Sequence, residues 1–144
     1  MSRSDHPHFF SPDDVNALIP RLEECFQNFW EFRQKAQDIL EELRKRARDP
    51  QSYLPQEVAH CQMRQSQAHF LLEQAKHEMD GILEMGCLIK DLEIGLVDFP
   101  HALEMEGEEI YLCWKYGEKK VRFWHEIHEG FSARKPIPRK VPHS

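Results

Sequence analysis

The sequence predicts an α+β fold, with a long antiparallel, coiled-coil-like helical hairpin followed by a small antiparallel β-meander. Apolar residues recur with helical spacing from residue 11 to about residue 86. From there to residue 134 they alternate with polar residues in short runs bounded by turn residues, which is typical of strands. The 144 residues, 40% of them hydrophobic, suit one domain. We expect the hairpin at about 11–86, the meander at about 87–134 and an extended or disordered tail at 135–144.

The first helix is expected to begin at Ser11, whose hydroxyl can cap it. Pro12 suits the first helical position, and Asp13 and Asp14 suit the positive end of the helix dipole. A line of apolar residues with heptad spacing then continues along the helix: Val15, Leu18, Leu22, Cys25, Phe29, Phe32, Ala36, Ile39 and Leu43. Because this line keeps its phase across Pro20, we expect the helix to continue through the proline with a kink.

The second helix is predicted from about residue 55 to residue 85, after a turn short enough to make the two helices antiparallel neighbours. Its apolar stripe consists of Val58, Cys61, Ala68, Leu72, Ala75, Met79 and Ile82. Four large apolar residues lie off the two stripes: Phe26, Trp30, Met63 and Phe70. Such residues favour a second packing surface. Since symmetric dimers are the commonest assembly, the sequence predicts a homodimer formed by the helices.

The meander is expected to follow Gly86, a residue that often ends a helix. Strands are predicted at about 87–92, 96–103, 109–116 and 121–127, with tight turns at 105–108 and 117–120. Pro100 lacks a backbone N–H, so it belongs at a sheet edge or a bulge.

Charge and composition exclude several classes of function. A net charge of −6 and a pI near 5.8 argue against partners such as nucleic acid or an anionic membrane surface. No apolar run approaches the roughly 20 residues that span a bilayer. The N-terminal residues lack the apolar core of a signal peptide, and the four cysteines form no Cys-x-x-Cys pair. We therefore expect a cytoplasmic protein with free, mostly buried thiols.

Four stretches of the chain carry a resemblance to a known family. They are FSPDDVNALIPRL (residues 10–22), KDLEIGLVDFP (90–100), YLCWKYGE (111–118) and FWHEIHEGFSAR (123–134). Together they resemble a prokaryotic family known as domain of unknown function 2203, over nearly the whole chain. The resemblance implies no activity, because the family carries no established one.

Candidate site residues gather in the predicted meander: Asp91, Asp98, His101, His125, Glu126 and His128. Carboxylates with imidazoles suit a divalent metal or an acid/base pair, and Asp98, His125 and Glu126 are the candidate metal ligands. The structural alternative is that Asp98 caps a turn, His125 is hydrogen-bonded within the sheet and Glu126 faces water. Which of the two holds, and with it whether any cofactor binds, stays open at this point.

A second candidate site uses Asp98, Trp114, His125 and Arg134 to hold a small anionic ligand. Arg134 would supply a bidentate guanidinium contact and the aromatic side chain a pocket wall. Cross-strand aromatic packing is the alternative role for Trp114. Cys113, between two apolar residues of a strand, is predicted to be a packed thiol rather than a nucleophile.

Three classes of function remain open. The favoured one is a non-enzymatic interaction or regulatory protein that dimerises through its helices and presents a small ligand or partner site on its sheet. The second is a small metal-dependent or acid/base enzyme that uses Asp98, His125 and Glu126. The third is a structural coiled-coil adaptor.

Overall fold

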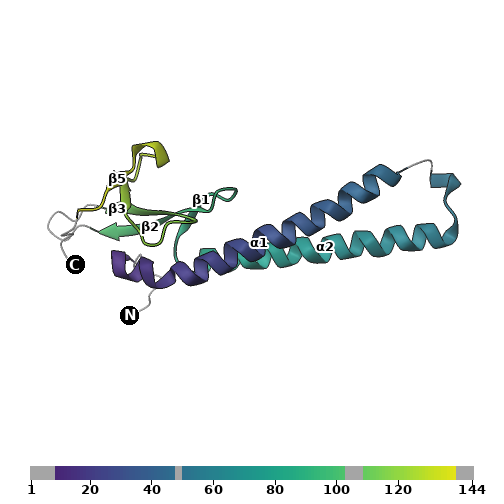
Figure 1. The fold of residues 1–144 in the computed structure, drawn as a ribbon, viewed down its shortest axis with the longest axis horizontal. Helices are drawn as coiled ribbons and strands as arrows, with labels where there is room; N and C mark the ends of the chain where they lie inside the picture. The colour runs from purple at the N-terminus through teal and green to yellow at the C-terminus, as the bar shows by residue number, and fades with distance from the viewer. Residues whose placement is uncertain (1–8, 48–49, 103–108, 139–144) are drawn as a thin grey trace. The chain divides into compact units, whose positions relative to one another are not determined.

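The computed structural model describes residues 9–47, 50–102 and 109–138. Two helices, α1 (Pro12–Arg46) and α2 (Pro55–Glu84), are joined through the short 3-10 helix η2 (Pro50–Ser52) and precede a sheet (Figure 1). The strands are β1 (Leu88–Asp91), β2 (Leu96–Ala102), β3 (Glu109–Lys115), β4 (Phe123–Glu126) and β5 (Lys135–Pro136), with the 3-10 helix η3 (Phe131–Ala133) before the last. The predicted α+β class, a helical hairpin followed by an antiparallel meander, is confirmed.

The chain divides into two compact units. The hairpin unit is Cys25–Gly81, and the sheet unit combines Met1–Glu24 with Ile82–Ser144. The boundary cuts through both helices, so the start of α1 belongs with the sheet. The expectation of one domain stays a prediction.

A reciprocal cap begins α1. The Ser11 hydroxyl oxygen accepts a hydrogen bond from the Asp14 N–H at 3.1 Å, and Asp14 Oδ2 accepts one from the Ser11 N–H at 3.0 Å. This pattern satisfies two N–H groups at the helix start. The helix then continues through Pro20 to Arg46, as its unbroken apolar pattern predicts.

The two helices run antiparallel within the hairpin unit. Asn28 Nδ2 donates to Glu78 Oε1 at 3.3 Å, and further along α1 the Glu42 carboxylate pairs with Arg64 at 3.1 Å. The buried apolar side chains of this unit are Cys25, Phe26, Phe29, Ala36, Ile39, Ala68 and Ala75. Three of these seven are alanines, so the unit buries little apolar area for its length. No helix in the described parts of the chain has the length and apolar character to cross a membrane.

The residues predicted to form an outer surface on the helices divide into two groups. Phe26 is fully buried and stacks on Trp30 with ring centroids 5.5 Å apart, so its assignment to an outer surface was wrong. The reason is that a stripe wider than the heptad line faces the core, as in most globular helices. Met63 and Phe70 remain 53% and 61% exposed.

Within the described residues the sheet has five strands in the order β1-β2-β3-β4-β5, each antiparallel to its neighbours. The first three strands lie close to their predicted positions, whereas β4 is shorter than the predicted 121–127. A fifth strand, β5, pairs with β4 inside the tail that was predicted to be extended or disordered. The predicted turn at 105–108 lies outside the described residues. Pro100 is on the part of β2 that β1 does not reach, as its missing N–H requires.

One face of the sheet packs against the start of α1. Val97, Phe99, Leu112 and Trp114 are buried on this face, which we call the helix-side face. The ring of Phe10 contacts that of Phe99 at 4.8 Å between centroids. Two hydrogen bonds reinforce this packing: the Phe10 N–H donates to the Pro100 carbonyl at 2.8 Å, and the Val121 N–H donates to the side-chain oxygen Oδ1 of Asn16 at 2.7 Å.

Gly86 makes the turn from α2 to the sheet. Its φ is +103°, in the region that favours glycine, and a Cβ at this position would lie 2.7 Å from Cζ of Phe10. Both the backbone conformation and the close approach of the ring therefore require glycine.

Candidate functional site

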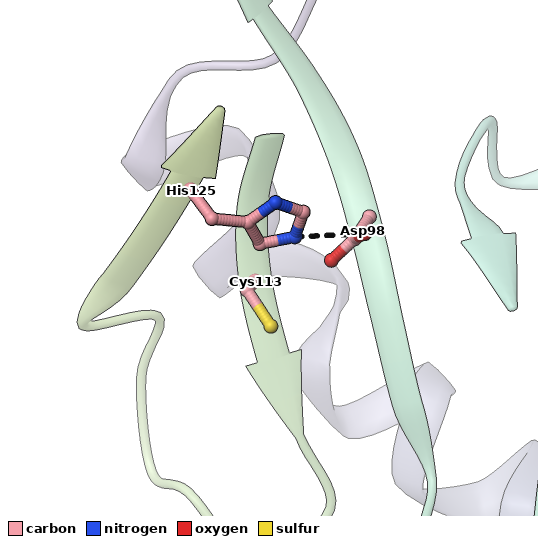
Figure 2. Close-up of side chains that lie close together, drawn as sticks. All are labelled: Asp98, Cys113 and His125. Carbon is pink, nitrogen blue, oxygen red and sulfur yellow. Dashed lines mark hydrogen bonds and ion pairs between the residues drawn. The ribbon is translucent and has the colours of Figure 1, made fainter. Parts of the chain in front are cut away.

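Three polar side chains meet on the opposite face of the sheet, away from the helix-side face. Asp98 of β2 lies opposite Cys113 of β3, and Tyr111 of β3 lies opposite His125 of β4. Since side chains two residues apart share a face, Asp98, Cys113 and His125 project to the same side. Figure 2 shows His125 and Asp98 pointing toward each other, with the Cys113 side chain beside them on the strand between. We call them the Asp–Cys–His cluster.

A short contact joins two members of the cluster. His125 Nε2 lies 2.9 Å from Asp98 Oδ2, drawn as the dashed line in Figure 2. Both side chains are at most 2% exposed. A buried charge is costly unless it is paired, so this contact is what makes the burial of the Asp98 carboxylate tolerable.

The hydrogen bond made by Nδ1, the other ring nitrogen of His125, indicates the tautomer of the ring. Nδ1 lies 2.8 Å from the backbone carbonyl oxygen of Glu126. A carbonyl oxygen only accepts, so Nδ1 carries a hydrogen and donates it. One further proton must then lie between His125 Nε2 and Asp98 Oδ2, because two lone pairs do not attract each other.

The second oxygen of Asp98 is the unexplained group in this site. Oδ1 is buried, and it accepts no hydrogen bond from any residue in the described part of the chain. Leaving a buried acceptor without a partner costs about 1–3 kcal/mol. Unsatisfied buried groups are rare in folded proteins, and they are commonly associated with function or with a bound ion or water.

Cys113 completes the cluster. One donor atom each from Asp98, Cys113 and His125 lie within 4.8 Å of one another, and the Cys113 side chain is fully buried. Burial, followed by the negative charge of Asp98, raises the pKa of the Cys113 thiol to about 12, while the nearby Arg134 guanidinium acts in the opposite direction. Both ring nitrogens of His125 are engaged, so neither is free to act as a base for this thiol.

Arg134 lies at the edge of the cluster, with Nη1 3.9 Å from the Cys113 sulfur. Its two terminal nitrogens already bond to both carboxylate oxygens of Glu118, at 3.4 and 3.1 Å. The guanidinium is also stacked over the rings of Phe123 and Phe131, at 4.0 and 4.4 Å from their centroids. An anionic ligand would therefore have to displace Glu118 before Arg134 could hold it.

Two of the predicted site residues project away from the cluster. Trp114 lies on the helix-side face, where its Nε1 donates to the Glu118 carbonyl at 2.8 Å. The Glu126 side chain is on the same face, since its strand position is next to that of His125, and it pairs with Lys135 at 3.8 Å. Only the backbone carbonyl of Glu126 contacts the cluster. The ligand and metal roles predicted for these residues stay predictions.

The other members of the predicted group take local roles. His101 Nδ1 lies 2.7 Å from the Phe10 carbonyl oxygen, to which it donates. Asp91 Oδ1 accepts the N–H of Glu93 at 2.9 Å within the turn after β1. His128 is exposed.

Sequence reasoning missed Cys113 as a member of the site, because a lone cysteine in an apolar strand is usually a packed thiol. A signal was present in the strand alternation. Cys113 has the same parity as Tyr111, the residue opposite His125, so both must share the face of the histidine. Using that signal requires knowing which strands pair and in which register.

Comparison with known protein families identifies a match over most of the chain. The chain matches the family described as "Uncharacterized conserved protein (DUF2203)" over residues 8–137. This range includes both helices and the whole sheet. No curated protein and no solved structure gave a significant match.

Proposed function

Because the chain belongs to the uncharacterized conserved family DUF2203, as its motifs implied, and the family description names no activity, we propose a function from the chain's own surfaces. It is a non-enzymatic interaction protein that acts as a homodimer. The dimer forms through apolar side chains that the helical hairpin leaves exposed. The observation that carries this proposal is the exposure of Met63 and Phe70, at 53% and 61%.

Met63 and Phe70 form one surface. They are seven residues apart on α2, so they share a face of the helix. With Ile39 of α1 and Leu71 they line a groove of about 500 Å³, whose wall is more apolar than polar. Ala68 and Ala75, which face the core of the hairpin, lie on a different side of α2. A helix with apolar residues on several sides is usually covered on several sides.

A second copy of the chain is the occupant that fits this groove. Two hairpins related by a two-fold axis form a four-helix bundle, the common way for helical hairpins to bury their remaining apolar surface. Met63 and Phe70 of one protomer would then lie against the same residues of its partner. Met63 and Phe70 are already partly covered, so burying the exposed remainder of four such side chains contributes roughly 3–7 kcal/mol. Association costs about 4–15 kcal/mol, so we expect a dimer that dissociates on dilution.

The alternatives have less support. An enzyme using Asp98 and His125 needs substrate to reach them, and both side chains are closed to solvent. A purely structural adaptor has no use for a buried carboxylate oxygen without a partner, since it lowers stability. A small anionic ligand would compete with Glu118 for Arg134.

Sedimentation over a range of concentrations tests the dimer. We expect the parent protein to shift from dimer to monomer on dilution, and Phe70→Glu to be monomeric throughout because it places two like charges at the interface. Leu72→Glu is the matched control. Leu72 is 41% exposed on the same helix but two residues away, and hence on another face.

Two results would refute this interface. One is a parent protein that stays monomeric at high concentration. The other is a Leu72→Glu variant that dissociates as readily as Phe70→Glu. Far-ultraviolet circular dichroism of both variants checks that the exposed substitutions leave the helices intact.

A further inference from the structure

We propose that Asp98, Cys113 and His125 form a binding site for one divalent transition-metal ion, with zinc as the best fit. Three adjacent strands bring one oxygen, one sulfur and one nitrogen donor to within 4.8 Å of one another. The inference is independent of the proposed dimer, because all three residues belong to the sheet unit.

The donor set selects the class of ion. Thiolate and imidazole ligands favour zinc and other late first-row metals, whereas calcium and magnesium take oxygen ligands. Zinc accepts sulfur, nitrogen and carboxylate oxygen together in tetrahedral sites. Three protein ligands leave the fourth position to a water molecule, since the described residues place only these three donors together.

Asp98 Oδ1 is an independent observation that points to a ligand. This oxygen is buried and lacks a hydrogen-bond partner among the described residues, while Oδ2 is bonded to His125. A cation beside Oδ1 would satisfy it. The unsatisfied oxygen therefore belongs to Asp98, the residue that lies beside both the Cys113 thiol and the His125 imidazole and would supply the oxygen ligand.

His125 is already oriented as a metal ligand. Its Nδ1–H donates to the Glu126 carbonyl, which leaves Nε2 directed at Asp98, 2.9 Å from Oδ2. Metal-binding histidines commonly donate their second ring nitrogen to a carbonyl or a carboxylate in this way, which fixes the ring and its tautomer. Glu126 thus takes part through its backbone rather than its side chain.

The charges also balance for a divalent ion. Binding removes the proton between His125 and Asp98 and the thiol proton of Cys113, and both pass to the solvent. What remains is a neutral imidazole, a carboxylate and a thiolate, whose two negative charges a divalent cation neutralises. The adjacent Arg134 is itself paired with Glu118 at 3.1 Å, so it adds little net charge at the edge of the site. A neutral assembly is the form that a buried site tolerates.

The geometry needs a small adjustment. With zinc bond lengths of about 2.0–2.3 Å, tetrahedral donors lie roughly 3.3–3.7 Å apart. The 2.9 Å contact between His125 Nε2 and Asp98 Oδ2 would open as the carboxylate turns Oδ1 toward the ion, and the longest separation within the cluster would shorten by up to about 1.1–1.5 Å. Side-chain rotation of Asp98 and Cys113 suffices for changes of this size.

Cobalt titration of the full chain tests the site. Cobalt(II) replaces zinc in such sites, and a bound thiolate gives it a charge-transfer absorption in the near ultraviolet. We add cobalt to chelator-treated, reduced protein, and then add zinc to displace it. We expect one cobalt per chain, a charge-transfer band, intense visible bands of a tetrahedral ion, and loss of all of them with one equivalent of zinc.

Substitutions assign the ligands. Cys113→Ser should abolish the charge-transfer band, and Asp98→Asn should weaken binding by more than roughly 100-fold, the upper range for loss of a supporting contact. The matched control is Cys87→Ser, which changes another buried free cysteine of the sheet unit outside the cluster and should leave the titration unchanged.

Three results would overturn the proposal. They are a parent chain without a stoichiometric cobalt spectrum, a charge-transfer band that survives Cys113→Ser, and a band lost equally in Cys87→Ser. The first needs no variant, so it decides the matter even if a substituted chain fails to fold. Native mass spectrometry of the parent chain with zinc alone gives a second, independent stoichiometry.

Discussion

Removing His125 should destabilise the sheet unit strongly. In His125→Ala the Asp98 carboxylate loses its 2.9 Å contact with the imidazole and stays buried, with Oδ1 already lacking a partner among the described residues. Breaking a buried pair by deleting one partner costs about 3–5 kcal/mol. Domains of this kind have total stabilities of about 5–15 kcal/mol, so this loss would be a large fraction. A histidine kept for ligand binding alone would cost much less to remove.

Urea denaturation followed by tryptophan fluorescence measures this loss, with a chelator present so that a bound ion does not contribute. Trp114 and Trp124 are in the sheet and report on the unit that contains the pair. The control is a double-mutant cycle with Asp98→Ala. Each single variant leaves one partner unsatisfied. The double variant should therefore lose less unfolding free energy than the two single variants lose together, by about 0.5–3 kcal/mol. A loss below about 1 kcal/mol in His125→Ala, or costs that simply add, would show that the contact does not stabilise the fold.

Two further predictions concern backbone conformation and thiol exposure. Gly117→Ala should lower the free energy of unfolding by about 1–3 kcal/mol, because Gly117 has a φ of +100° but open space around it. Gly86→Ala should lower it further, because the added Cβ also meets the Phe10 ring. Equal urea midpoints for the two variants would show that the Phe10 ring moves aside freely. Of the four cysteines only Cys61 is partly exposed, so a thiol reagent at mildly alkaline pH should modify one thiol rapidly and the other three only after denaturation. Burial, as its largest cause, raises the pKa of Cys87 to about 12, which strengthens this contrast, and rapid modification of more than one thiol would contradict it.

The sequence by itself determined the elements and most of their order. Ser11, Pro12 and Asp14 indicate where α1 begins, and the reciprocal hydrogen bonds confirm that start. Gly86 indicates where the helical part ends, because few other residues adopt its backbone conformation. Each of these signals depends on a few neighbouring residues, so a single sequence is enough to recognise it. The heptad line was also informative, and Val15, Leu22, Phe29 and Ala36 are all buried.

Only the tertiary structure decided which polar residues meet. Alternation within a strand shows which residues share a face, but the meeting of Asp98, Cys113 and His125 depends on the pairing of three strands and on the register of each pair. For the same reason Glu126, adjacent to His125 in sequence, points to the other face, whereas Cys113, on a different strand, lies on the face of His125. The fifth strand likewise depends on its pairing with β4, which the sequence pattern of the tail does not show. Strand pairing and register are set by long-range contacts, and no local pattern in a single sequence contains them.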